Sequence, residues 1–525
     1  MIIRRTFIAG AAAAWPTMAA HAAGRRSDPV VATRHGRVQG RRGDGIEIFL
    51  GVPYGADTRQ RRFQRAVPPA PWRDIRPATR FGDACPQRAL DESMSEDCLR
   101  LNIWTPGADA HARRPVLVYV HGGEYSSGSG GHPLTDGARL AAQGDVVVVT
   151  LNHRLNIFGH LHLDGVAPAF AGSGNVGITD VVLALQWVRD NIGAFGGAAG
   201  NVTVFGQSGG GAKIVTLLAT DATRGLFHRV LTMSGQQITV QGPRAAQARA
   251  RAVFAALGVK QGDVAALRAL PVERLVDATR AADPSMARST IYFGPVLDET
   301  VLSRHPFYPD APPQGASIPM IIGNTRDETR GLNGRSDPSL FDLTWDDLAA
   351  RLAPALFVDI DVALVIKTYR DLHPGISPPD LFFAATTAGR SWRAALIEAE
   401  LRAAQGAPVH MYQLDWRSPV DGGKWGAPHT IDIPLAFDTV GVASSANYAG
   451  GGAEARRMAS LMSGMLLSFA MTGTPRVSGV ADWARYTLPE RATMMLDLAP
   501  RLGFDPRGAE RRLFAKVPYI QRGTY

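Results

Sequence analysis

Cysteine and lysine are scarce in this sequence. The chain of 525 residues contains 2 cysteines, and lysine occurs only at positions 213, 260, 367, 424 and 516, so arginine supplies nearly all of the positive charge behind the formal net charge of +9. The arginines are scattered and form no dense basic block, so we expect no nucleic-acid partner. The composition, 45% hydrophobic and 20% charged, is that of an ordinary globular protein long enough for a large core.

The sequence also lacks a long apolar run at its N-terminus, where the apolar stretch is too short to remain in a membrane as a permanent anchor. Its first residues combine a basic start, a short apolar stretch and small residues, and Ala20-His21-Ala22 fits an A-x-A cleavage site. Arg4 and Arg5 resemble a twin-arginine export signal, with an ordinary secretory signal as the alternative. We therefore expect residues 1–22 to be the signal peptide of a bacterial protein that is exported to the periplasm or secreted.

The two cysteines, Cys85 and Cys98, lie close together in the sequence. In an exported protein, an even number of cysteines at short range predicts one disulfide that closes a small loop. The alternative is a pair of independent buried thiols. A twin-arginine substrate folds before export, so the bond would have to form afterwards.

Short apolar runs alternate with helical patterns along the chain. Runs of this kind, nearly continuous in apolar residues, are typical of central strands that are covered on both faces. The alternation predicts an α/β fold with a mostly parallel sheet. Before these runs, the β-rich stretches 30–38 and 46–52 predict an N-terminal hairpin. The expected strands are 101–104, 116–120, 146–151, 202–205, 230–233, 319–323 and 409–416, of which 116–120 and 146–151 are the nearly continuous runs expected at the centre.

Two helical blocks interrupt this alternation, at about 243–290 and 343–405. We interpret both as insertions that cover the sheet, so that residues 23–525 form a single domain. The sequence shows no internal repeat and no long linker that would argue for separate domains. These blocks are also expected to line the substrate pocket, with Tyr125 as a further candidate.

One serine stands in a glycine-rich turn directly after the expected strand 202–205. Residues 206–210 read GQSGG, and a helical pattern follows. G-x-S-x-G between a strand and a helix is the nucleophile elbow of α/β hydrolases, and the alternative is a flexible solvated turn. An elbow holds its serine in a strained conformation, and its neighbours lack side chains so that strand and helix can approach. Ser208 is therefore the candidate nucleophile.

A nucleophilic serine needs a general base, and the base needs an acid that orients it. The polar loop after the strand 319–323 offers Asp327 or Glu328, and the spacing does not choose between them. Of the three later histidines, His410 lies in an apolar strand and His373 precedes a proline at a helix end. His429 lies in a loop after the strand 409–416, where catalytic residues are common, and it is the favoured base.

Backbone donors for an oxyanion are expected after an earlier strand. The run 116–120 leads into His121-Gly122-Gly123-Glu124, where two consecutive glycines let backbone N–H groups approach a substrate oxygen. The alternative is a plain glycine turn.

Taken together, these motifs resemble the type-B carboxylesterases, the cholinesterase-like branch of the α/β-hydrolase fold. Several stretches match in the same order, which is more specific than any single motif. They extend from about residue 30 to near the C-terminus. The matching stretches are 49–54 (FLGVPY), 95–102 (SEDCLRLN), 121–123 (HGG), 152–154 (NHR), 174–177, 184–187, 191–192, 195–197, 202–210, 323–328 (GNTRDE) and 429–434 (HTIDIP).

The resemblance implies roles for particular residues. It implies Ser208 as nucleophile, His429 as general base and Glu328, rather than Asp327, as the acid. The resemblance also implies an α/β-hydrolase fold in which helical insertions cover the active site. It implies hydrolysis of a small ester through an acyl-serine, with no metal or organic cofactor. It further implies oxyanion donors in the backbones of Gly123, Glu124 and Gly209, a bond between Cys85 and Cys98, and supporting positions at Glu96 and Ser234.

Other reactions of the same three side chains remain open. A lactonase, a thioesterase or an amidase would use the same groups, and a non-catalytic binding protein on this fold would typically have lost one of them. Acyl length, alcohol size, natural substrate and oligomeric state are not readable from the sequence.

Two positions depart from the family pattern. Residue 207 is Gln where the family usually has Glu, which argues against cationic substrates. Residue 124 is Glu where Gly or Ala is usual. Its N–H can still donate, but an inward carboxylate would oppose the oxyanion, so we expect it to point away or to be held by an arginine.

Overall fold

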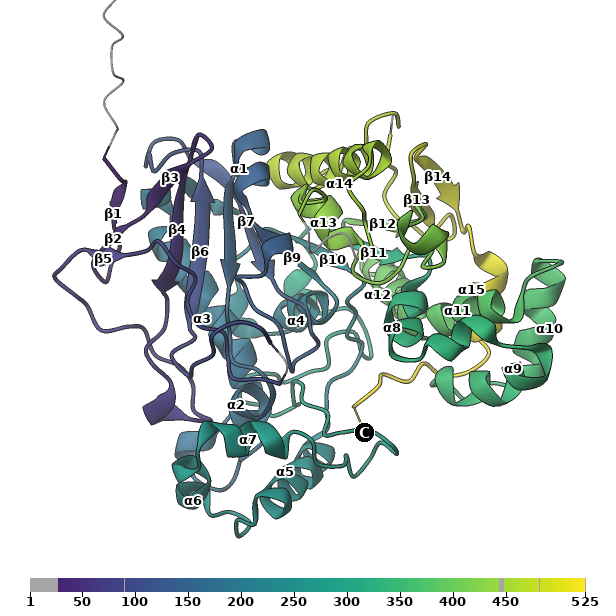
Figure 1. Ribbon diagram of the computed structural model, residues 1–525, viewed down its shortest axis with the longest axis horizontal. Helices are drawn as coiled ribbons and strands as arrows, with labels where there is room; N and C mark the ends of the chain where they lie inside the picture. Colours follow the sequence, from purple (N-terminus) through teal and green to yellow (C-terminus); the bar gives the residue numbers. More distant parts are fainter. Residues whose placement is uncertain (1–26, 89, 443–447, 481, 525) are drawn as a thin grey trace, which may run out of the picture.

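A large mixed sheet runs through the protein, as the computed structural model of the chain shows (Figure 1). The structure describes residues 27–88, 90–442, 448–480 and 482–524, so the predicted signal peptide 1–22 lies outside the described residues. The eleven strands lie in the order β14 (Arg501–Phe504), β13 (Ala492–Leu496), β12 (Val409–Leu414), β11 (Met320–Thr325), β10 (Arg229–Met233), β9 (Gly197–Gln207), β7 (Arg114–Val120), β8 (Val147–Leu151), β6 (Arg100–Thr105), β4 (Ile46–Pro53) and β3 (Arg41–Gly43).

The centre of this sheet is parallel, as the sequence predicts. Strands β8, β7, β9, β10, β11, β12 and β13 pair in parallel, and the strands outside them pair antiparallel. Because side chains alternate along a strand, Val116 and Val118 of β7 join one apolar cluster while Leu117 and Tyr119 join the other. The apolar runs in the sequence therefore mark strands that are buried on both faces.

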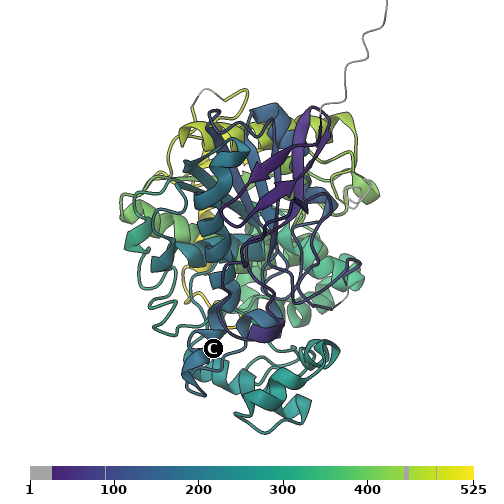
Figure 2. The ribbon, with the colours of Figure 1, turned by 90° about the vertical axis from the view of Figure 1, so that its left-hand side faces the viewer.

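Helices cover both faces of the sheet (Figures 1 and 2). On one face α3 (Val176–Asn191) and α4 (Gly209–Leu218) contribute to the cluster of Val116 and Val118. On the other face α1 (Ala138–Gly144), α13 (Asp432–Phe437) and α14 (Ala453–Thr472) contribute to the second cluster. This is the α/β-hydrolase arrangement that the resemblance implies.

Both blocks that the sequence predicts to be helical contain helices. The first holds α5 (Pro243–Leu257), α6 (Val264–Ala269) and α7 (Val272–Ala278), which lie at the lower end of the molecule in Figures 1 and 2. The second lies beside α8 (Glu328–Ser336) and α15 (Gly508–Phe514) at the right of Figure 1. It holds α9 (Trp345–Leu352), α10 (Val362–Leu372), α11 (Pro378–Thr387), a π-helical turn (Ala388–Trp392) and α12 (Arg393–Ala404).

The predicted N-terminal hairpin between 30–38 and 46–52 is wrong. The first stretch reverses within itself, because Thr33 and Gly36 exchange backbone hydrogen bonds and close a turn. Strand β1 (Val30–Ala32) therefore pairs with β2 (Arg37–Gln39), and β5 (Arg76–Pro77) completes a separate small sheet. Strand β4 pairs with β3 and β6 in the main sheet instead.

The predicted disulfide is also absent from the structure, in which Cys85 and Cys98 are free and buried. Each sulfur has a hydrogen-bond partner in the thiol form. The N–H of Leu155 donates to Cys85 Sγ at 3.2 Å. A hydrogen bond with Cys85, together with burial, raises the pKa of the Cys98 thiol. The two sulfurs are therefore close neighbours that do not need a covalent bond to satisfy their surroundings.

Among the described residues, one helical stretch, 168–195, is long and apolar enough to cross a membrane by length and composition alone. It contains α3, and 72% of its most apolar window is buried inside the protein. Its apolar side chains pack against the sheet, as those of a core helix do.

A buried ion pair links α3 to the loop after β8, and it offers a test of the fold. Arg154 and Asp180 are both buried, and the guanidinium donates to the carboxylate through Nε at 2.8 Å and Nη2 at 2.7 Å. Arg154→Met should lower the free energy of unfolding by about 3–5 kcal/mol, because it leaves the Asp180 charge buried without a partner.

Chemical denaturation followed by fluorescence measures this change. Arg224→Met removes an exposed pair with Asp221 and should have little effect. Equal effects of the two substitutions would contradict the role of the buried pair.

Candidate active site

Ser208 lies in a sharp turn between the end of β9 and the start of α4. Its φ is +55°, in the left-handed region that residues with side chains rarely adopt, so the turn holds the strained conformation that the sequence predicts. The N–H of Ser208 donates to the carbonyl of Met233 at 2.8 Å, which ties the turn to the end of β10. Ser208 is therefore held at the edge where the parallel strands end.

The glycines around Ser208 allow the backbone to pack closely. A Cβ at Gly206 would lie 2.8 Å from the carbonyl carbon of Gly210, and one at Gly210 would lie 2.0 Å from the carbonyl oxygen of Val120. A Cβ at Gly235 would lie 1.9 Å from the carbonyl oxygen of Ser208. No side chain fits at these contacts, so the glycines are there for close approach rather than for flexibility.

Glu328 and His429 are in contact, although 101 positions separate them in the sequence. His429 Nδ1 donates to Glu328 Oε2, and the N–H of Thr325 donates to Oε1 at 2.9 Å. Burial raises the pKa of Glu328, but the charge of His429 and the hydrogen bond to it outweigh burial and lower the pKa overall. Glu328 is thus ionised and fixes the proton on Nδ1, which leaves Nε2 as an acceptor.

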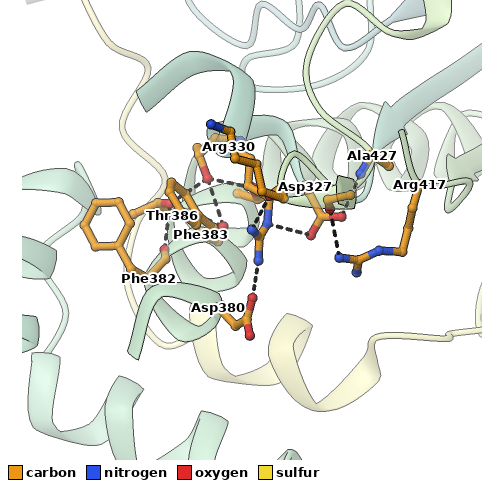
Figure 3. A network of polar contacts seen from close by, with 12 residues as sticks. Asp327, Arg330, Asp380, Phe382, Phe383, Thr386, Arg417 and Ala427 are labelled. Atoms are coloured by element: carbon orange, nitrogen blue, oxygen red, sulfur yellow. Dashed lines mark hydrogen bonds and ion pairs between the residues drawn. The ribbon is translucent and has the colours of Figure 1, made fainter. Parts of the chain in front are cut away.

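Asp327, the other candidate acid, binds the loop that carries His429 rather than the imidazole. Its Oδ2 accepts from the N–H of Ala427 at 2.9 Å (Figure 3). Figure 3 also shows Arg330, which forms an ion pair with Asp380 and lies 3.9 Å from Asp327. Glu328 therefore contacts the imidazole, whereas Asp327 contacts the backbone of the loop that carries His429.

The two other candidate bases, His373 and His410, lie away from Ser208. His373 is exposed at the end of α10, and His410 is buried in β12 against Trp483, with ring centroids 5.8 Å apart. Neither lines the cavity that contains Ser208.

Ser208 and His429 line the same cavity, which has a volume of about 450 Å³. Ser208 Oγ has no hydrogen-bond partner among the residues that the structure describes. His429 Nε2 instead lies 3.3 Å from Gln207 Nε2, which donates to it. The imidazole lone pair is thus directed into the cavity and is bound by an amide in this state.

Three backbone N–H groups adjoin Ser208 at the cavity wall. Gly123, Glu124 and Gly209 all line the cavity, and the N–H groups of Gly123 and Glu124 have no acceptor among the described residues. Gly209 is the first residue of α4, where N–H groups have no partner within the helix. A Cβ at Gly209 would lie 2.5 Å from the nitrogen of Glu124, so the two segments are in contact. The arrangement leaves donors free beside the serine.

Comparison with known proteins agrees with this geometry. The sequence model of the carboxylesterase family matches residues 27–343, more than half of the chain. The chain belongs to the carboxylesterase family. It is therefore a carboxylic ester hydrolase.

Individual relatives resemble this carboxylesterase over nearly their whole length. The para-nitrobenzyl esterase of Bacillus subtilis (strain 168) is 34% identical over 92% of this chain and 98% of its own. The phenmedipham hydrolase of Pseudarthrobacter oxydans is 30% identical over 89% and 95%. The crystal structure of a carboxylesterase from Geobacillus stearothermophilus superimposes with a TM-score of 0.83 at 36% identity, covering 92% and 99% of the two chains.

Glu124, at one of the two unusual positions of this carboxylesterase, lines the cavity in an exposed position with a φ of +52°. It forms no ion pair within 4 Å among the described residues. The ion pair with an arginine, one of the two expected arrangements, is therefore not formed. Burial lowers the pKa of Arg390, and the charge of Glu124 partly offsets this, which places Glu124 within electrostatic reach of Arg390.

A buried lysine that was not predicted as a functional residue supports the loop of the free N–H groups. Lys213 of α4 is fully buried and donates to the carbonyls of His121 at 3.1 Å and Glu124 at 2.6 Å. Burial lowers its pKa to about 7, partly offset by the charge of Glu124. A single lysine in the apolar run GGGAKIVTLL is the signal that could have revealed it.

A second buried carboxyl, also not predicted as a functional residue, lies within electrostatic reach of Glu328. Asp432 is fully buried at the start of α13. Burial raises its pKa to about 7, and the negative charge of Glu328 adds to this while His429 opposes it. The pKa values of these two neighbouring carboxyls are thus shifted in opposite directions. At a pH just below 7, Glu328 is ionised while most Asp432 side chains keep their proton.

The wall of the cavity comes from more segments than predicted. The second helical block contributes Phe357 and Arg390, as predicted. The prediction is wrong for the first block, because none of the described lining residues comes from it and Tyr292 lies just after it. Tyr125 lines the cavity. The segment 519–522 near the end of the chain also lines it, and no pattern in the sequence indicated this.

The buried Lys213 makes stability depend on pH. Its pKa is about 7 in the folded protein and about 10.4 in an unfolded chain. Between these values the unfolded chain binds a proton that the folded protein does not, so stability rises with pH. The melting temperature of the wild type should therefore rise relative to that of Lys213→Met from about pH 7 to about pH 9.

Thermal melts of both proteins across this range measure the difference. Lys260→Met, at an exposed lysine, is the control and should show a constant difference from the wild type. Parallel curves for wild type and Lys213→Met would contradict the lowered pKa.

Proposed function

We propose that this enzyme hydrolyses carboxylic esters through an acyl-serine on Ser208, with His429 as general base and Glu328 as the acid that orients it. The observation that supports this is the hydrogen bond from His429 Nδ1 to Glu328, with His429 and Ser208 on one cavity. That arrangement leaves Nε2 free of a proton, as a base requires.

The proposed reaction has two halves. Ser208 Oγ attacks the ester carbonyl while Nε2 of His429 takes its proton, and the free N–H groups of Gly123, Glu124 and Gly209 bind the oxyanion, with about 2.7–4 kcal/mol lost when one such donor is removed. The acyl C–O bond then breaks as His429 returns the proton to the leaving alcohol. Water repeats the sequence on the acyl-serine and regenerates the hydroxyl.

The resting contact between Gln207 and His429 Nε2 gives way in this scheme. Ser208 Oγ–H has to replace the Gln207 amide as the donor to Nε2 before attack. Catalytic hydrogen bonds are often long or misaligned without substrate and tighten when it binds. The proposed function therefore includes a small side-chain rearrangement at Gln207 on substrate binding.

The relatives support esters as the substrate class. Two of them are named as esterases, a para-nitrobenzyl esterase and a carboxylesterase, and a third is named a phenmedipham hydrolase. Lactonase, thioesterase and amidase reactions would use the same groups, but no feature of the site favours them over esters. The presence of all three side chains argues against a non-catalytic binding protein.

Ser208→Ala should lower the rate of p-nitrophenyl ester hydrolysis by at least about 10⁴-fold, because it removes the atom that forms the acyl-enzyme. Release of p-nitrophenol measures the rate, and an unchanged melting temperature shows that the protein is folded. Ser391→Ala alters another serine of the same cavity and should keep most activity. Turnover of Ser208→Ala at the wild-type rate would overturn the assignment.

The neighbouring acids provide a matched test of the base. Glu328→Gln should lower kcat by about 10³–10⁴-fold, since the imidazole loses the carboxylate that fixes its tautomer and stabilises its charge. Asp327→Asn keeps an oxygen for the N–H of Ala427 and should stay within about tenfold of wild type. Steady-state kinetics on one ester compares the two, and the reverse order of losses would contradict the choice of Glu328.

A further inference from the structure

Two arginines, Arg390 and Arg522, line the cavity of Ser208. Arg390 and Arg522 form no ion pair, and their side chains donate no hydrogen bond, among the residues that the structure describes. We propose that the enzyme prefers esters that carry a carboxylate group, which Arg390 and Arg522 bind. This inference rests on the proposed ester hydrolysis at Ser208 and names the substrate class of that site.

Arg390 occupies an unusual place in the chain. It lies in the π-helical turn between α11 and α12, a kind of turn that occurs frequently at functional sites. The neighbouring Arg393 is used within the fold, because it donates to the carbonyl of Val517 and lies over the ring of Tyr519. Within the part of the chain that the structure describes, the Arg390 side chain has no such partner, and it lines the cavity.

An arginine in this position is costly without a ligand. Arg390 is only partly accessible, and burial lowers its pKa because it disfavours the charged form. Buried or partly buried cations are normally paired, as Arg154 and Arg249 are in this protein. A bound carboxylate would supply the missing partner through two parallel N–H···O bonds.

Arg522 adds a second, exposed positive group to the lining of the cavity. Its guanidinium lies over the ring of Phe357, 5.2 Å from the centroid, in an exposed position. It also lines a second cavity of about 540 Å³, which shares Glu124 and Tyr292 with the first. Arg88 and Arg280 also line that second cavity, so arginines are found in the lining of both cavities.

The balance of charge at the wall favours an anion. Glu124, Arg390 and Arg522 are the charged side chains of the first cavity among its described lining residues, and Gln207 adds no charge. Glu124 forms no ion pair within 4 Å with either arginine. Even if Glu124 offsets one of them, a net positive charge remains, which attracts a carboxylate and repels a cation.

The carboxylate takes no part in the chemistry. The acyl C–O bond of the ester breaks, water supplies a hydroxyl to the acyl group and a proton goes to the alcohol, as in the proposed function. The distal carboxylate anchors one end of the substrate while the ester carbonyl lies at Ser208. A cavity of about 450 Å³ is within the range of small-ligand sites.

Two pairs of esters, equal in shape but not in charge, test the inference. 4-Acetoxybenzoate and 4-acetoxybenzamide place the difference on the alcohol side. The monomethyl ester of benzene-1,4-dicarboxylic acid and methyl 4-carbamoylbenzoate place it on the acyl side. For each pair, the ratio of kcat/KM for the charged ester to that for the neutral ester is measured in the wild type and in variants, so intrinsic differences in ester reactivity cancel.

In at least one pair, the double variant Arg390→Gln, Arg522→Gln should lower this ratio about tenfold or more, mainly through KM of the charged ester. Hydrolysis of the neutral ester should change less than about threefold. Glu124→Gln should raise the ratio, because it removes the opposing charge. Added salt should lower the wild-type ratio, since screening weakens exposed charge interactions.

Arg244→Gln is the matched control, an exposed arginine of α5 that lines neither cavity, and it should leave both ratios unchanged. Unchanged ratios in the double arginine variant for both pairs would overturn the inference. Wild-type protein that is folded but hydrolyses neither member of either pair would instead overturn the ester hydrolysis itself. The neutral esters separate these two results, because they report hydrolysis without the carboxylate.

Discussion

The hydrogen bond between Glu328 and His429 is the contact on which the site depends. It joins the start of α8 to a loop that follows β12, and it keeps a fully buried carboxylate ionised. A charge buried this deeply is unfavourable unless it is paired and hydrogen-bonded, and here the imidazole and the N–H of Thr325 provide both. The same contact sets the tautomer of His429, so the electrostatics of one buried acid decide which nitrogen faces the cavity.

The parallel sheet explains how distant residues reach this contact. Parallel strands end at one edge, and the loops that leave β7, β9, β11 and β12 carry the free N–H groups, Ser208, Glu328 and His429 in turn, with β10 between β9 and β11. The close backbone contacts at Gly206, Gly210 and Gly235 then hold these loops together without side chains between them. Lys213, beneath the loop of N–H groups, adds a fixed donor to two of its carbonyls. The arrangement is therefore rigid where the chemistry is proposed to take place.

Much of this could be predicted from the sequence, because strand burial, glycine spacing and strand-to-loop transitions are local signals. The parallel centre of the sheet, the elbow and the loop of His429 are of this kind. The choice between Asp327 and Glu328 is not local, because adjacent residues at a helix start point in different directions. The same holds for Lys213, Asp432 and the segment 519–522, whose importance arises only from burial among distant elements. The prediction of an N-terminal hairpin was wrong because a turn within 30–38 folds that stretch back on itself. The prediction of a disulfide was wrong because Cys85 and Cys98 are free thiols with hydrogen-bond partners.

The walls of the cavity and its floor come from different parts of the chain. The floor is built from strand ends and close-packed glycines, where nearly every added atom would collide with backbone. The walls at Phe357, Arg390 and Arg522 belong to the second helical block and to a segment near the end of the chain. Substrate preference can thus drift during evolution, or be redirected by engineering, through substitutions on the walls that leave the reacting groups untouched. Libraries aimed at a new ester would be concentrated there rather than around the serine.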